Sequence, residues 1–416
     1  MVVKLDEVKF IDEIDLMGKR VFIRCDFNVP LKNGEITDAT RIEAALPTIK
    51  YALEKGAKVA LASHLGRPKG KVVPELSMKP IGEYLITALR KEIILTDSPD
   101  SEGLTKLMET LNDGQVVLLE NLRFSPFEKK NDKIFAARLA KSFDVYVNDA
   151  FGTAHRAQVS TEALAHEVKE ACAGFLIKKE LEKFNYMLSE AKKPFVAILG
   201  GAKVSDKIGV ITNLMDKVDS IIIGGAMANT FMAAKGYDMG KSLVEKDAIE
   251  VAKQIMEKAE RKGVTLNLPV DFVGATEFKN DAEFATYKPE DFPADRMALD
   301  IGEETRENYR SIILKAKTVF WNGPMGVFEL ENFAKGTLAV TVAVTKSDAY
   351  SVVGGGDSVA AIKYLKLEDK ITHVSTGGGA SLEYIEGKEL PALKVLKDLK
   401  AAEDANNIKF AEDFKE

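Results

Sequence analysis

A chain of 416 residues with 46% apolar and 29% charged residues is too long for one ordinary hydrophobic core, so we expect two domains. The formal net charge of −6 argues against a broad nucleic-acid surface, which needs an excess of basic residues. The only cysteines, Cys25 and Cys172, exclude a disulfide framework and a cysteine metal cluster, and we interpret them as buried structural thiols in place of nucleophiles. The charged N-terminus lacks a signal-peptide core, and the apolar stretch 220–234 is too short to span a membrane. We therefore expect a cytoplasmic protein.

Short β-branched runs alternate with stretches of helical spacing from end to end, which is typical of βαβ units and a parallel sheet. In the first part the expected strands are Arg20–Cys25, 57–62, 115–120 and 144–148, and a helix is expected at 40–55. A charged run of helical spacing at 176–191 predicts a connecting helix. In the second part the expected strands are Phe195–Leu199, Ser220–Ile223, 318–321, 350–353 and 372–375, with helices at 247–262 and after Pro391.

In open parallel sheets, ligands bind beyond the carboxyl ends of the strands, so the residues after each expected strand are informative. In the first part these residues are polar or basic: Asp26, Asn28, Ser63, His64, Arg67, Asn121, Arg123, Asn148, Asp149, His155 and Arg156. Five arginines lie near strand ends or a helix start: Arg24, Arg41, Arg67, Arg123 and Arg156. Each alone reads as a surface ion pair, but together they predict a site for a small, highly anionic molecule.

In the second part glycines follow the strands, at 200–201, 224–225, 323, 354–356 and 377–379. Such turns let backbone N–H groups approach phosphates, although close strand-to-helix packing also explains a single glycine run. Lys203 and Lys207 are expected to open the helix after the first run and to face the same anion; a solvated helix face is the alternative. Two different ligands are therefore predicted, one for each part of the chain.

Asp357 follows the glycines 354–356, where its carboxylate suits a Mg²⁺ ion whose other ligands are nucleotide phosphates and water. The alternative is that Asp357 is the N-cap of a helix beginning at Ser358. The segment 236–242 looks like a P-loop but has one residue too few between its glycines and follows no expected strand, so we reject it. The scattered histidines and cysteines give no zinc-ligand spacing.

Several long motifs resemble those of the phosphoglycerate kinase family, and the resemblance covers essentially the whole chain. They are RCDFNVP at 24–30, SHLGRP at 63–68, ENLRF at 120–124, NDAFGTAHR at 148–156, GGAKVSDK at 200–207, WNGPMGVFE at 321–329 and GGGDS at 354–358. The resemblance implies reversible phosphoryl transfer between ATP and the carboxylate of 3-phosphoglycerate, giving 1,3-bisphosphoglycerate and ADP in glycolysis. Phosphoryl transfer needs positioning and positive charge more than a strong base, in agreement with the residues found.

Carried over by position, the resemblance implies a 3-phosphoglycerate site at Asp26, Asn28, Arg41, His64, Arg67, Arg123 and Arg156. It implies a nucleotide site at Gly201, Lys203, Lys207, Gly225, Asn322, Pro324, Glu329, Gly354, Gly355, Gly356, Asp357 and Ser358, with Asp357 on Mg²⁺. Arg41, Lys203 and Gly378 would be catalytic, the last through the 377–379 turn, which would stabilise the moving phosphoryl group.

Pattern and resemblance together predict an α/β fold: two Rossmann-like three-layer domains, each a parallel sheet flanked by helices, joined by a hinge helix. The expected divisions are 1–172 for 3-phosphoglycerate, 173–193 for the hinge, 194–390 for the nucleotide, and 391–416 returning to the first domain. The tail from about residue 401 is longer than usual. We expect a monomer that binds neither nucleic acid nor membranes. The alternatives are a dehydrogenase, whose nicotinamide fingerprint is missing, and a non-catalytic anion-binding or nucleic-acid-binding protein.

Overall fold

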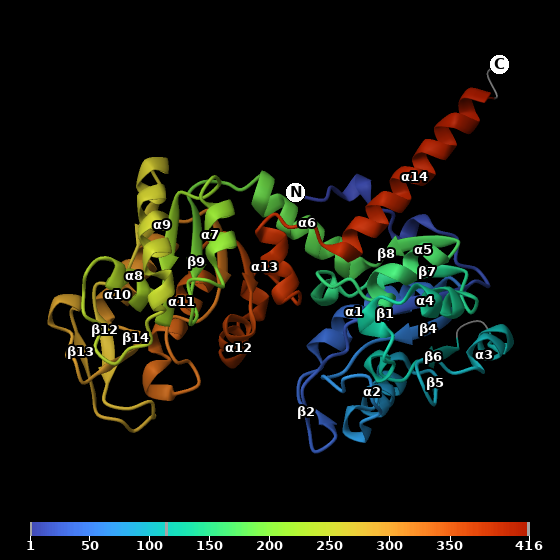
Figure 1. Ribbon diagram of the computed structural model, residues 1–416, viewed down its shortest axis with the longest axis horizontal. Coiled ribbons are helices and arrows are strands. Elements are labelled where there is room, and N and C mark those ends of the chain that lie inside the picture. The colour runs from blue at the N-terminus through green and yellow to red at the C-terminus, as the bar shows by residue number, and fades with distance from the viewer. Residues whose placement is uncertain (1, 113–114, 414–416) are drawn as a thin grey trace. The chain divides into compact units, whose positions relative to one another are not determined.

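The computed structural model describes residues 2–112 and 115–413, and the chain divides into two compact units. Unit 1 comprises Met1–Glu182 with Glu389–Glu416, and unit 2 comprises Lys183–Lys388. Each unit contains a six-stranded sheet whose strand pairs are all parallel, with helices packed against it (Figure 1). The predicted α/β class is confirmed.

The sheet of unit 1 has the strand order β5-β6-β4-β1-β7-β8. Its strands are β1 (Arg20–Cys25), β4 (Lys58–Ala62), β5 (Ile93–Leu95), β6 (Val116–Leu118), β7 (Val145–Asp149) and β8 (Glu170–Ala173). The central strands β1 and β4 are buried on both faces, which is why they are mostly apolar, although β1 also carries the buried Arg24. Val21 and Ile23 pack with helix α1 (Thr40–Glu54), while Phe22 points to the other face and stacks on Tyr146 with ring centroids 5.8 Å apart.

The helices of unit 1 are α1 (Thr40–Glu54), α2 (Lys79–Leu89), α3 (Leu104–Thr110), α4 (Lys133–Ala140) and α5 (Leu164–Glu167), and a hairpin joins β2 (Leu31–Lys32) to β3 (Glu35–Ile36). Strands β4, β5 and β6 lie on one side of β1 in the sheet, and the later strands β7 and β8 lie on its other side. This reversal of strand order places the carboxyl ends of β1 and β7 at the switch point of the sheet, where ligands bind in such folds.

The sheet of unit 2 has the order β11-β10-β9-β15-β16-β17, which is the strand order of a Rossmann sheet. Its strands are β9 (Phe195–Leu199), β10 (Ser220–Ile223), β11 (Thr265–Asn267), β15 (Thr318–Asn322), β16 (Tyr350–Gly354) and β17 (His373–Val374). Its helices are α7 (Ile208–Leu214), α8 (Ala226–Ala234), α9 (Ile249–Lys262), α10 (Glu303–Ile313), α11 (Lys335–Lys346), α12 (Gly356–Tyr364) and α13 (Gly379–Ile385). Its switch point lies between β9 and β15.

The prediction of parallel sheets from end to end is wrong for one segment. Strands β12 (Phe272–Ala275), β13 (Phe284–Tyr287) and β14 (Met297–Ile301) form a separate antiparallel sheet in the order β13-β12-β14. The connection from β12 to β13 is too short for a parallel crossover, which takes a dozen or more residues. The short strands β5, β8 and β11 were also missed, because three or four residues at a sheet edge give no readable period.

Two long helices account for the remaining predicted elements. The predicted connecting helix is α6 (Phe175–Ser189), and the boundary between the two units falls within it. Helix α14 (Pro391–Asp413) begins against unit 1, where Ala392 N–H donates to the Ala154 carbonyl at 3.1 Å. Its later turns reach away from unit 1 in Figure 1, and residues 401–408 are exposed.

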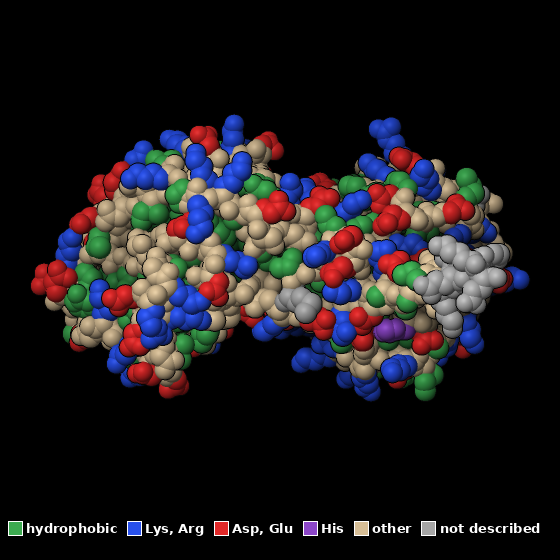
Figure 2. All heavy atoms as spheres, turned by 90° about the horizontal axis from the view of Figure 1, so that it is seen from above, with side chains coloured by type: hydrophobic (Ala, Val, Ile, Leu, Met, Phe, Trp, Pro, Cys, Tyr) green, Lys and Arg blue, Asp and Glu red, His purple; other side chains and the backbone are tan. Residues whose placement is uncertain are grey.

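The distribution of surface charges and the burial of the two cysteines agree with the expectations from composition. On the face shown in Figure 2, basic and acidic side chains are interspersed over both units. Cys25 and Cys172 are both fully buried, and burial holds the pKa of each thiol well above its usual value, which confirms their structural interpretation. Among the described helices, none combines the length and apolar character that crossing a bilayer requires.

Candidate active site

The first cluster lies at the carboxyl edge of the unit 1 sheet. The loop after β1 supplies Asp26 and Asn28, the loop after β4 supplies His64, and the start of α1 supplies Arg41. Arg41 Nη1 donates to Asp26 Oδ2 at 2.8 Å, and Asn28 Oδ1 accepts from Gly66 N–H at 2.9 Å. These bonds tie the β1 loop to its neighbours, so the side chains are held in place before any ligand arrives.

Three predicted arginines of this cluster line one small pocket. The pocket has a volume of about 340 Å³ and is lined by Arg67, Arg123, Lys129, Arg156 and Gln158. Burial, and then the charges of Arg156 and Arg24, lower the pKa of Arg123 to about 10. Because like charges have been brought this close in a partly buried pocket, an anion would relieve their repulsion. Lys129 and Gln158 were missed by sequence reasoning, since Lys129 sits in an ordinary-looking charged run.

Arg24 is the exception among the five arginines. It is fully buried within β1, where its Nε donates to Ser160 Oγ at 2.8 Å, and its Nη2 lies 3.3 Å from His64 Nδ1. A guanidinium group can only donate, so His64 Nδ1 accepts and its ring proton sits on Nε2. Burial and the neighbouring arginines hold the pKa of His64 well below its usual value, so the ring is neutral. Arg24 is therefore better placed to orient His64 than to meet a ligand.

The second cluster lies at the carboxyl edge of the unit 2 sheet, where glycine loops follow β9, β10, β15 and β16. Close packing explains some glycines: a Cβ on Gly200 would lie 2.0 Å from the Pro324 carbonyl oxygen. It does not explain Gly201, Gly356 and Gly378, where a Cβ would meet nothing within 4 Å. Both alternatives from the sequence therefore apply, at different positions, and the open glycines are those free to approach a ligand.

The open glycines border a pocket of about 430 Å³, named the polar pocket for the charged and amide side chains on its walls. Lys203, Lys207, Asn322 and Asp357 also line it. Lys207 is 8% exposed and donates to Asn322 Oδ1, and burial lowers the pKa of Lys207 to about 8 despite nearby carboxylates. Asn322 Nδ2 is buried and has no hydrogen-bond partner among the residues that the structure describes. The pocket thus holds a desolvated cation and an unused donor, both suited to phosphate oxygens.

The expectation that both lysines open a helix is wrong. Helix α7 begins at Ile208, so Lys207 is its N-cap residue and Lys203 lies in the preceding loop with its side chain exposed. The loop is anchored by the buried Val204 and by Ser205 N–H, which donates to Glu245 Oε2 at 3.0 Å. Both lysines nevertheless line the same pocket, as the sequence predicted.

The N-cap alternative for Asp357 is also wrong. Helix α12 begins at Gly356, with Gly355 as its N-cap residue, and Asp357 makes no cap hydrogen bond. Its side chain is exposed to solvent on one side only: partial desolvation by the surrounding protein, together with the charge of Glu329, raises its pKa, while Lys207 opposes the shift. Ser358 instead is fully buried and its Oγ accepts from Gly323 N–H at 2.7 Å, so it supports the loop after β15.

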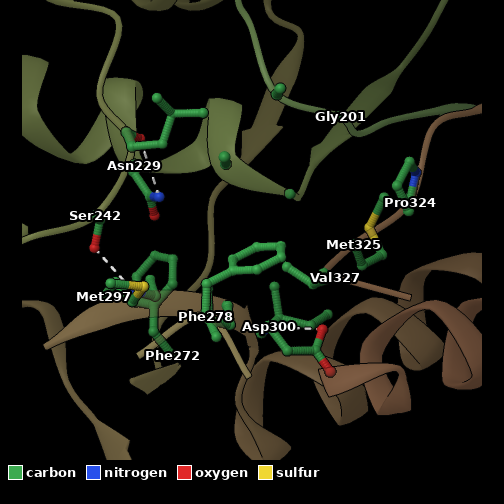
Figure 3. A pocket seen from close by; sticks show the side chains of 18 of the residues that line it. Gly201, Asn229, Ser242, Phe272, Phe278, Met297, Asp300, Pro324, Met325 and Val327 are labelled. Carbon is green, nitrogen blue, oxygen red and sulfur yellow. Dashed lines mark hydrogen bonds between the residues drawn. The ribbon is translucent and has the colours of Figure 1, made fainter. Parts of the chain in front are cut away.

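A larger, mostly apolar pocket of about 600 Å³ adjoins the polar one in unit 2 (Figure 3). The two share Gly201, Ala202, Pro324 and Asp357 as lining residues. Further walls are formed by Gly225, by Glu329, and by residues on or beside the antiparallel sheet such as Phe272, Phe278 and Met297. Sequence reasoning missed Phe272, Phe278 and Met297 as lining residues because it did not predict the antiparallel sheet.

Among the side chains that the structure describes, those of residues 2–112 and 115–408, no group of three or more His, Cys, Asp or Glu is placed to bind a metal. A metal at this edge would therefore depend on ligand oxygens supplied by a substrate. The carboxylates of Asp357 and Glu329, which line the apolar pocket and interact through their charges, are candidate protein ligands.

Comparison with known proteins identifies the family. The phosphoglycerate kinase family profile matches residues 11–388. A phosphoglycerate kinase of Clostridium botulinum strain Hall is 52% identical over 392 residues, which cover 94% of this chain and 98% of the relative. The solved phosphoglycerate kinases of Coxiella burnetii and Pyrococcus horikoshii are 44% and 34% identical, with TM-scores of 0.85 and 0.82, each alignment covering 94% of this chain and 100% of the other. This chain belongs to the phosphoglycerate kinase family.

Proposed function

We propose that the two clusters divide the substrates of the phosphoglycerate kinase reaction, in which a phosphoryl group moves reversibly between ATP and 3-phosphoglycerate. Unit 1 takes 3-phosphoglycerate and unit 2 takes the nucleotide. The observation that carries the assignment is the pair of joined pockets in unit 2. An apolar pocket beside a polar, lysine-containing one matches a flat base followed by charged phosphates. Phe278, whose side chain is 62% exposed at the apolar pocket, offers a ring face for the base.

The unit 1 cluster suits the acid substrate for the opposite reason. Its pocket of about 340 Å³ is small and lined almost wholly by cations, so it fits a phosphate group and offers little to a base. Arginine forks bind phosphate and carboxylate oxygens with two parallel hydrogen bonds, and several converge here. His64, neutral and held by Arg24, adds an N–H donor at Nε2 without adding a further charge.

The residues of unit 2 also fit a Mg²⁺ ion bound with the nucleotide. Asp357 and Glu329 place two carboxylates close enough for the charge of Glu329 to raise the pKa of Asp357, a repulsion that a divalent cation would relieve. Mg²⁺ takes one or two carboxylates and completes its shell with phosphate oxygens and water. When bound, it neutralises developing charge on the phosphates. We assign Asp357 as the direct ligand.

The chain's own residues act mainly by position and charge. A carboxylate oxygen of 3-phosphoglycerate forms a bond to the terminal phosphorus of ATP, the bond from that phosphorus to the bridging oxygen breaks, and ADP leaves with the bond's electrons. No protein base is needed, because the attacking group is already ionised. The exposed Lys203 side chain and the backbone at Gly378 and Gly379 line the polar pocket, where an ammonium group and backbone N–H groups can stabilise charge on the moving group.

A crossed pair of variants tests the division. Arg123→Met removes a wall of the small basic pocket, and Val244→Trp fills the apolar one. Calorimetry should show that Arg123→Met weakens 3-phosphoglycerate binding at least tenfold and leaves MgADP unchanged, as expected for a lost charge-assisted contact. Val244→Trp should do the reverse. Ser311→Trp is the matched control, because Ser311 is exposed and lines another pocket of unit 2. If either test variant weakened both ligands equally, the division would be wrong.

A further inference from the structure

Asn229 presents an unusual group inside the apolar pocket. It lies on α8, is 1% exposed, and its Nδ2 donates to the Leu243 carbonyl at 3.2 Å. Its Oδ1 is buried and has no hydrogen-bond partner within the described part of the chain. A buried acceptor left without a donor is destabilising, so such an atom calls for an explanation.

The orientation of the Asn229 amide follows from its neighbour. The Leu243 carbonyl can only accept, so the NH₂ end of the amide must face it, and a flipped amide would place two acceptors together. Oδ1 is thereby turned toward the pocket, on the side where Phe272 and Met297 lie (Figure 3). The pocket thus contains one acceptor whose direction is fixed by the backbone.

The charged residues on these walls, Lys241, Glu329 and Asp357, are exposed, and the two remaining polar side chains are already used. Asp300 accepts from Ile301 N–H at 2.9 Å and from Gly336 N–H at 2.8 Å, and Ser242 Oγ accepts from Ala298 N–H at 2.8 Å. Of the described side chains lining this pocket, Asn229 alone keeps a buried oxygen without a donor.

We propose that Asn229 is a specificity residue that reads position 6 of the purine base. This inference rests on the proposed function, in which the apolar pocket holds the base. Adenine carries an amino group at position 6, which can donate to Oδ1. Hypoxanthine and guanine carry a carbonyl oxygen there, which would face Oδ1 acceptor to acceptor. A site with a buried polar group rejects a ligand that leaves it unpaired, so the bases differ by about tenfold to a hundredfold in affinity.

The first test needs no variant. Calorimetry of the full chain with MgADP, MgIDP and the Mg²⁺ complex of purine riboside 5′-diphosphate, which has hydrogen at position 6, compares a donor, an acceptor and neither. MgADP should bind at least tenfold more tightly than MgIDP, with the third ligand between them. Equal affinities for MgADP and MgIDP would overturn the inference.

The second test assigns the effect to Asn229. Asn229→Leu keeps the approximate size of the side chain and removes both polar atoms. The Leu243 carbonyl loses its hydrogen bond to Asn229, but Leu243 is 58% exposed. The ratio of the MgIDP to the MgADP dissociation constant should fall toward one. A ratio that matches the unaltered chain would overturn the inference, and Asn229→Ser, which is too short to reach, provides the same readout if the leucine variant does not fold.

Val244→Trp separates this inference from the proposed function. If it weakens MgADP binding while Asn229→Leu leaves the ratio unchanged, the pocket holds the base but Asn229 does not read it. If it leaves MgADP binding unchanged, the pocket is not the base site, and both proposals are overturned.

Discussion

Raising the pH should weaken nucleotide binding through one buried lysine. Lys207 is 8% exposed and borders the polar pocket, and burial lowers its pKa from 10.5 to about 8, although Asp206, Glu386 and Asp357 oppose the shift. The free protein therefore holds Lys207 about nine-tenths charged at pH 7, half charged at pH 8 and about one-tenth charged at pH 9.

The direction follows from which form binds phosphate. Only the charged ammonium attracts phosphate oxygens, so bound nucleotide raises the pKa of Lys207, and binding takes up a proton when the free lysine is neutral. Affinity is complete below the pKa of the free protein, about 8, and is lost as the pH rises through it. The apparent dissociation constant of MgADP should therefore increase about tenfold between pH 7 and pH 9.

Calorimetry in two buffers of different ionisation enthalpy measures both the affinity and the proton uptake. The phosphates of ADP complete their titration near pH 6 and contribute little above pH 7.5. Lys207→Met should bind MgADP weakly at every pH and take up no proton, while Lys235→Met, a change in a separate pocket of unit 2, should keep the full profile. A dissociation constant that stays flat from pH 7 to pH 9, without proton uptake, would refute the placement of Lys207 at the phosphates.

Three further substitutions separate the remaining roles. Lys203→Ala should lower kcat about a hundredfold or more, because its exposed ammonium is proposed to act on the moving phosphoryl group, and a change confined to KM in steady-state assays would contradict that role. Asp357→Asn should weaken MgADP binding and leave 3-phosphoglycerate binding unchanged. If calorimetry gave the variant the same MgADP affinity as the unaltered chain, Asp357 would not be the metal ligand. Arg41→Ala breaks the 2.8 Å pair with Asp26 and should impair 3-phosphoglycerate use strongly, whereas an equally large loss of nucleotide affinity would argue against separate sites.

Much of the fold was readable from the sequence because the central strands are buried on both faces. Strand β9 is an unbroken apolar run and β1 a mostly apolar one, and each is followed at once by a glycine-rich or polar loop. Helix α9 ends where predicted, at Lys262, with Gly263 as its C-cap residue at φ 67°. These are local signals: a period, a burial pattern and a stop. Motifs of several residues then indicated the family. The hinge role of residues 173–193 and the division of substrates remain predictions.

The tertiary structure was needed for every feature that depends on contacts between segments far apart in the sequence. Gly200 and Gly201 are indistinguishable in the sequence. In the structure the Pro324 carbonyl oxygen packs closely against Gly200, whereas the space beside Gly201 is open. Arg24 looks like its neighbours in sequence, but its place inside β1 turns it toward His64.

The same reason explains the residues that sequence analysis overlooked. Lys129 becomes part of the small basic pocket only when its turn meets the loops that carry Arg67 and Arg156. Asn229 sits in an apolar helix, and nothing in that helix shows that a carbonyl from Leu243 will hold one end of its amide. A residue's local pattern sets its element and its burial, whereas its partners come from segments far along the chain. The chemistry of a side chain therefore became clear only when those segments were in place.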